Sequence, residues 1–163
     1  MFSNQSLSRL LEDLQGLAAD APRTAAFSAA DGIDVNIDFT AVDRLACAFR
    51  ELRVSGPAIA GVPFATLSKW ADQLCQRVTY LLEQVGPLEH DAAAETVLIR
   101  STPPARQAEK TTFYEIVLHA PDTLTLRRYR RITRDANREQ IDLQMTHEVL
   151  EKLTTDLVAT LPA

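Results

Sequence analysis

The chain has 163 residues, of which 46% are hydrophobic and 24% charged, and its formal net charge at pH 7 is −5. This is the size of one ordinary domain with a near-average globular composition, which excludes extended disorder and fibrous repeats. The apolar runs are far shorter than the roughly 20 residues that cross a bilayer, and acidic residues interrupt the N-terminal segment where a signal peptide is apolar. We therefore expect a single cytoplasmic domain over 1–163 that does not associate with membranes.

The first predicted element is an amphipathic helix over about residues 4–19. Its apolar side consists of five leucines at helical spacing, Leu7, Leu10, Leu11, Leu14 and Leu17. An alanine-rich connection over 20–32 follows.

Strict alternation over 33–39 predicts a strand with Asp34, Asn36 and Asp38 on its polar face. These three residues are also spaced like the start of a calcium-binding loop. The glycine and the glutamate that such a loop requires later are missing, so we interpret the trio as a solvated strand face. Residues 45–54 have a less regular pattern that favours a strand that either contains a bulge or is covered on both sides, with a helix as the alternative.

An apolar loop containing Ile59 and Val62 comes next and precedes a helix that is predicted to end at Gly86 and Pro87. Trp70 lies beside the apolar stripe of this helix. Ile59, Val62 and Trp70 together form a candidate partner surface, although a connector tucked against the core is the favoured reading of the loop. The predicted unit over 33–86 is therefore β-β-α.

The remainder of the chain is predicted as a β-meander over 92–145 and a C-terminal helix over 146–161. A short strand at 140–145 is left open. The predicted fold class is α+β, with an antiparallel sheet of about five to six strands and three helices packed mainly on one face. The order of elements is α-β-β-α-β-β-β-(β)-α.

Six arginines and one tyrosine crowd the segment 124–143, which reads LTLRRYRRITRDANREQIDL. With a four-residue turn before it, Glu115 faces Arg128 and Tyr114 faces Tyr129 on the preceding strand. Arginines then point to both faces, so we expect the second half of this strand to extend past the edge of the core.

This arginine strand has two interpretations. In the first, Arg127, Tyr129, Arg131 and Tyr114 form a patch that binds a small anion or single-stranded nucleic acid. In the second, which we favour, Glu115 pairs with Arg128 and the arginines are structural. The stretch 122–138 carries a charge of +4, which leaves −9 on the rest and argues against nucleic acid as a partner.

No catalytic, metal or cofactor site is predicted. None of the three histidines has a zinc-like spacing to other ligands, and no nucleophile motif is present. Cys47 and Cys75 are the only cysteines, and this sparse usage favours a reducing compartment over a disulfide framework.

We therefore predict a non-enzymatic protein-interaction module that forms a homodimer and acts as a chaperone or adaptor. The alternatives are an anion or single-stranded nucleic-acid binder that uses residues 124–134, and an enzyme whose site is assembled from distant segments. The order of elements and the acidic charge resemble those of type III secretion chaperones, small dimers that hold an unfolded effector segment. The chain departs from that pattern in its extra strands before the last helix.

Overall fold

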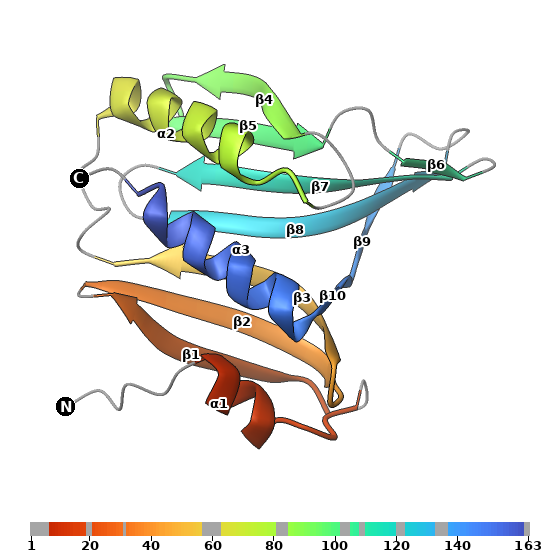
Figure 1. Ribbon diagram of the computed structural model, residues 1–163. Helices are drawn as coiled ribbons and strands as arrows, with labels where there is room; N and C mark the ends of the chain where they lie inside the picture. Colours follow the sequence, from red (N-terminus) through yellow and green to blue (C-terminus); the bar gives the residue numbers. More distant parts are fainter. Residues whose placement is uncertain are drawn as a thin grey trace.

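The computed structural model describes residues 7–18, 21–30, 32–56, 63–80, 85–101, 105–107, 110–119, 123–132 and 137–161. Within these ranges the chain forms three helices and one antiparallel sheet of ten strands (Figure 1). The predicted α+β class with an antiparallel sheet is confirmed, but the sheet has more strands than expected.

The elements follow one another as α1 (Leu7–Asp13), β1 (Arg23–Ala30), β2 (Ile33–Val42), β3 (Ala46–Ser55), α2 (Phe64–Arg77), β4 (Val85–Asp91), β5 (Thr96–Ser101), β6 (Ala105–Gln107), β7 (Lys110–His119), β8 (Thr123–Ile132), β9 (Arg138–Ile141), β10 (Leu143–Thr146) and α3 (His147–Ala159).

The sheet consists of two groups of strands that are joined in its middle. Its main order is β1-β2-β3-β8-β7-β5-β4, and the three short strands β10, β6 and β9 pair with β3, β7 and β8. Strands β1 to β3 are neighbours both in sequence and in space, and so are β7 and β8. The two groups meet where β3 pairs with β8, from Leu52 opposite Leu126 to Ser55 opposite Thr123.

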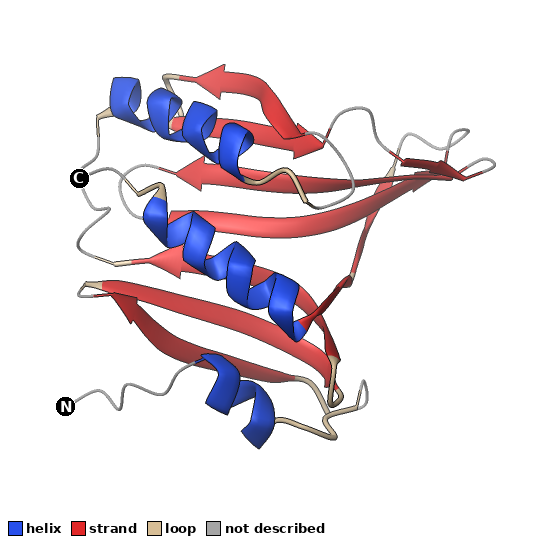
Figure 2. Ribbon diagram, in the orientation of Figure 1, coloured by secondary structure: helices blue, strands red, loops and turns tan. Residues whose placement is uncertain are grey.

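All three helices lie on the same side of the sheet (Figure 2). Their apolar stripes and the alternate residues of the strands beneath them form one core, because each element has only one apolar face to bury. The largest fully buried side chains are Phe39, Phe49, Leu11, Ile37, Leu52, Leu67, Leu74, Ile99, Ile116, Leu118 and Leu124. The opposite side of the sheet, which no described helix covers, is called the open face below.

The segment 20–32, predicted as a connection, contains strand β1. Its Ala25 and Phe27 pair with Ile37 and Val35 of β2, with a register shift near its end. Alanines give almost no contrast between an apolar and a polar face, so the alternation is hidden in the sequence.

The second helix is shorter than predicted, because it ends at Arg77. Gly86 and Pro87, which were expected to end it, instead belong to strand β4. A proline is tolerated there because β4 is the last strand of the sheet, and the pairing with β5 is irregular between Pro87 and Glu89.

Other boundaries follow from specific contacts. The first helix ends at Asp13 rather than near residue 19, since Gly16 has a φ of +95° and donates its N–H to the carbonyl of Val42. The strand prediction for 45–54 is confirmed, as is its bulge. The region 140–145, left open, holds parts of β9 and β10. Among the described residues, no helix is long and apolar enough to cross a membrane.

Candidate functional site

Strands β7 and β8 extend past the helices and form a projecting arm together with β9 (Figure 1). The arm is defined here as residues 110–115, 127–132 and 138–141. The expectation that the arginine strand runs beyond the core edge is therefore confirmed. Leu124 and Leu126 at its start are fully buried. The arginines follow where no described helix lies above the strand (Figure 1).

The register of the arm differs from the prediction by one residue. His119 pairs with Thr123, so the turn is one residue shorter than expected. As a result Glu115 pairs with Arg127, and Tyr114 pairs with Arg128. The predicted contact between Glu115 and Arg128 is wrong for this reason.

The shift also divides the predicted anion patch. Side chains alternate along a strand, so Arg127, Tyr129 and Arg131 lie on the open face while Tyr114 lies on the opposite side. There Tyr114 is buried, and the guanidinium carbon of Arg128 lies 5.2 Å from the centre of its ring. The structure does not bring Tyr114 to the other three residues.

On the open face of the arm, two aromatic rings are enclosed by arginines. Phe113 and Tyr129 stack with ring centres 5.8 Å apart. The guanidinium of Arg138 lies 4.0 Å from the centre of the Tyr129 ring, and that of Arg100 lies 4.7 Å from the centre of Phe113. Both rings are buried although no described helix lies over them. The arginine side chains thus take the role of a covering layer.

Two carboxylates lie beneath these arginines, and each contacts two guanidinium groups. Glu115 accepts hydrogen bonds from Arg100 at 3.2 Å and from Arg138 at 2.5 Å. Glu51, on β3, accepts from Arg53 at 2.6 Å and from Arg127 at 2.7 Å.

The Glu51 carboxylate is held in its charged form. Burial raises the pKa of Glu51, but the hydrogen bonds from Arg53 and Arg127 outweigh burial, so the pKa lies below its ordinary value. Arg127, a residue of the predicted patch, is therefore engaged in an ion pair. Arg131 is exposed and makes no ion pair with a described residue.

Sequence reasoning missed Glu51, Arg53, Arg100 and Arg138 as members of this cluster. Arg53 lies across from Thr125 of β8, and Arg138 across from Arg131. The pairing of β3 with β8 joins distant segments, so no local pattern could reveal it. Arg138 belongs to the same arginine-rich stretch as Arg131, but its pairing depends on the return of the chain along β8 as strand β9. One signal in the sequence could have placed Glu51 and Arg53 on the face opposite the core, namely their alternation with Leu52 and Val54, which are buried.

The structure does not show the predicted partner surface of Ile59, Val62 and Trp70. Ile59 and Val62 lie outside the described residues. Trp70 is 2% exposed, and its indole N–H donates to the hydroxyl of Thr160 at 3.1 Å. The prediction for Trp70 is therefore wrong, because the helix turns this ring into the core.

A third buried carboxylate, Asp156 of α3, ties the two long helices together. It accepts hydrogen bonds from Arg77 at 2.9 Å, Tyr80 at 2.6 Å and Lys152 at 3.2 Å. Burial raises the pKa of Asp156, but these three hydrogen bonds outweigh burial and hold the pKa below its ordinary value. The chain leaves the helix before Tyr80, which places the phenol against α3.

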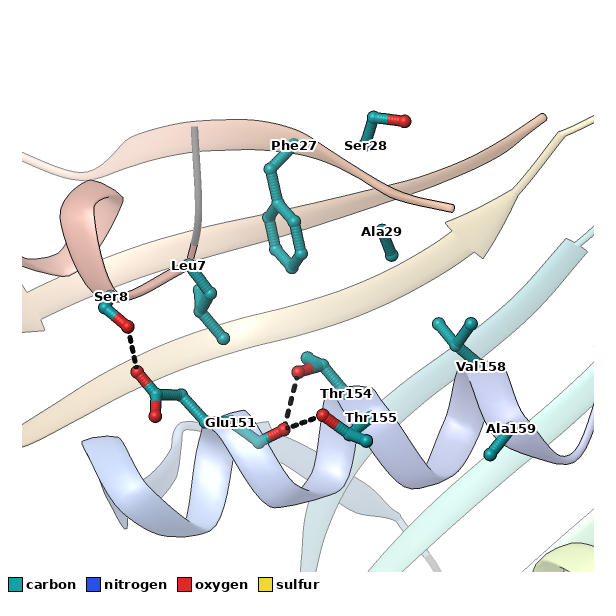
Figure 3. Close-up of a pocket in the computed structure, with 10 residues that line it drawn as sticks. All are labelled: Leu7, Ser8, Phe27, Ser28, Ala29, Glu151, Thr154, Thr155, Val158 and Ala159. Carbon is teal, nitrogen blue, oxygen red and sulfur yellow. Dashed lines mark hydrogen bonds between the residues drawn. The ribbon is translucent and has the colours of Figure 1, made fainter. Parts of the chain in front are cut away.

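A groove of about 650 Å³ lies between α1, β1 and α3 (Figure 3). It is lined by Leu7, Ser8, Phe27, Ser28, Ala29, Glu151, Thr154, Thr155, Val158 and Ala159. Its polar groups largely bond to one another: Ser8 donates to the Glu151 carboxylate at 2.7 Å, and both threonines donate to the Glu151 carbonyl. Phe27 and Val158 project toward each other across it, so the groove offers mainly apolar contacts (Figure 3).

Strand β1 borders this groove and forms one end of the sheet. Among the described strands only β2 pairs with it. Residues 24–30 contain no charged residue and no proline. The opposite end, β4, differs because it contains Pro87, Glu89 and Asp91, residue types that discourage pairing with a further strand.

The described residues contain no group of three or more potential metal ligands. Burial raises the pKa of Cys47 to about 12 and that of Cys75 to about 11, so neither thiol is activated as a nucleophile.

Ser68 and His90 contact each other at 3.0 Å on the surface. Ser68 lies inside α2, where the backbone N–H groups are used by the helix and cannot stabilise an oxyanion.

No protein-family model, no curated protein and no solved structure matches the chain. Function must therefore be inferred from these surfaces.

Proposed function

We propose that the chain is a protein-interaction module that associates with a second copy of itself through the free edge of β1. The observation that carries the proposal is the outer edge of β1 over residues 24–30, which holds no charged residue and no proline and pairs with no described strand. A free edge presents a row of backbone donors and acceptors that another strand can pair with, and proteins that stay monomeric usually block such edges with charge or proline.

A twofold axis suits this edge. An antiparallel pair of identical strands is self-complementary: if one residue of the first copy contacts a second residue of the other copy, the reverse contact is made as well. Pairing two copies of β1 would continue the sheet from one subunit into the other. Each backbone hydrogen bond contributes about 0.5–1.5 kcal/mol net, so a row of them is a substantial contribution.

The groove beside β1 supplies apolar area that strand pairing lacks. A stable interface usually buries at least about 1,200 Å² in total, more than one pair of short strands provides. Phe27 belongs to β1, is half-buried and lines the groove. A partner strand that pairs with β1 can therefore add side-chain contacts in the groove. An extended segment of another protein could use the same edge, as in a chaperone or adaptor.

The test is the molar mass of the protein in solution, measured by light scattering after size exclusion at tens of micromolar. Ala26 is exposed on β1, and its change to lysine places a charge on the edge strand. The control is Ser55→Lys, which adds the same charge on the central strand β3, next to Asp34.

We expect a dimer for the unmodified protein and for the control, and a monomer for Ala26→Lys. Circular dichroism should show that both variants are folded. A monomeric unmodified protein, or a dimer that survives Ala26→Lys, would overturn the proposal.

A further inference from the structure

The arm concentrates positive charge on an acidic protein. Its residues 110–115, 127–132 and 138–141 include six basic residues and two acidic ones, a net charge of +4. Subtracting this from the total of −5 leaves −9 on the rest of the chain. Charge separation of this kind creates a local potential that attracts an anionic partner to one place.

The charges of the open face are arranged in two layers. The carboxylates of Glu51 and Glu115 lie underneath, with side chains 11% and 6% exposed. The guanidinium groups above them reach the solvent, with Arg53, Arg127 and Arg138 between 37% and 43% exposed. Each carboxylate is shared by two arginines, so each trio keeps one net positive charge on its outer side.

These guanidinium groups are also fixed in position before any partner binds. Arg138 is stacked on Tyr129, and Arg127 is held by Glu51. Arginine side chains that are already ordered lose less conformational freedom on binding. Arg131 adds a further exposed guanidinium on the same face, and it has no ion pair with a described residue.

From these observations we propose that the open face of the arm binds an acidic segment of a partner protein through Arg53, Arg127, Arg131 and Arg138. Carboxylates suit this surface because the planar forks of arginine donate two parallel hydrogen bonds to them. Nucleic acid suits it less. The rings of Phe113 and Tyr129 are covered by arginines and offer no face on which a base can stack.

This surface is separate from the edge of β1, so the two proposals can fail independently. The probe is a fluorescently labelled oligoglutamate peptide, and binding is followed by fluorescence anisotropy with the full chain. A labelled oligo(dT) of similar charge is measured in parallel. The key variant is Arg131→Gln, because Arg131 is exposed and makes no ion pair with a described residue. Its matched control is Arg44→Gln, the same change in the exposed turn between β2 and β3.

We expect oligoglutamate to bind more tightly than oligo(dT), and its binding to weaken as the salt concentration rises. Arg131→Gln should reduce the affinity about two- to five-fold, the range of one exposed ion pair, and Arg44→Gln should leave it unchanged. Tighter binding of oligo(dT) would overturn the acidic segment as the partner. Equal affinities of the two variants, or no binding of oligoglutamate at low salt, would overturn the site itself.

Discussion

Replacing Glu115 by glutamine should cost about 2 kcal/mol of unfolding free energy, because this carboxylate joins β5, β7 and β9. Its side chain is 6% exposed and pairs with Arg100 and Arg138. Removing one member of a fully buried ion pair costs about 3–5 kcal/mol. The two arginine side chains are 26% and 37% exposed and keep part of their hydration, so a smaller loss is expected here.

The assay is chemical denaturation, supported by thermal unfolding, in which 2 kcal/mol corresponds to a fall of about 4–8 °C for a chain of this size. The matched control is Glu139→Gln on the same arm. The Glu139 side chain is 67% exposed and pairs with Arg130. This change should alter the stability by less than about 0.5 kcal/mol. If both variants lose the same stability, or Glu115→Gln loses none, the buried carboxylate does not hold the arm.

Two further predictions concern the buried Asp156 and the glycine that follows β3. Asp156→Asn should destabilise the protein by about 1–3 kcal/mol at pH 7. Since the pKa of Asp156 is below its ordinary value of 3.8, its contribution is present above that pH and is lost as the pH falls through the lower value of the folded state. Denaturation at several pH values should therefore show the difference between variant and unmodified protein vanishing in acid; a difference that persists would contradict this. Gly56→Ala should cost more than about 2 kcal/mol, because an added Cβ would meet the carbonyl oxygen of Gly32 at 2.0 Å and φ is +142°. Gly16→Ala, with φ at +95° and open space around it, should cost about 1 kcal/mol in the same denaturation assay, and equal losses would refute the steric argument.

The parts of the fold that could be predicted are those with strong local contrast. Residues 33–39 alternate isoleucine, valine and phenylalanine with polar residues, and they form the start of β2 as expected. The C-terminal helix also begins where the sequence predicts, because Thr146 caps it by accepting the N–H of Val149 at 3.2 Å. Strand β1 is not predicted from the sequence because alanine is compatible with either face of a sheet. Strand β4 is not predicted because its glycine and proline are residues that usually end helices.

The candidate site was harder to predict, since it depends on register. A turn shorter by one residue moves every side chain of β8 relative to β7 and changes the partner of Glu115. The sequence showed correctly that the arginines leave the core. It could not show that Glu51 and Arg53, roughly 70 residues earlier, complete the cluster, because strand order is a property of the whole chain.

The junction between β3 and β8 has a consequence for how the protein folds. Leu52 and Leu126 are neighbours in the sheet but roughly 70 residues apart along the chain. Hairpins such as β2–β3 and β7–β8 close short loops, so they can form early. Joining the two halves closes a much longer loop, at a greater entropic cost, before α3 can seal the core. We therefore expect this late union of two preformed half-sheets to limit the folding rate. A chain arrested before it would expose β3 and the first half of β8 as additional free edges, since β9 already covers the second half of β8.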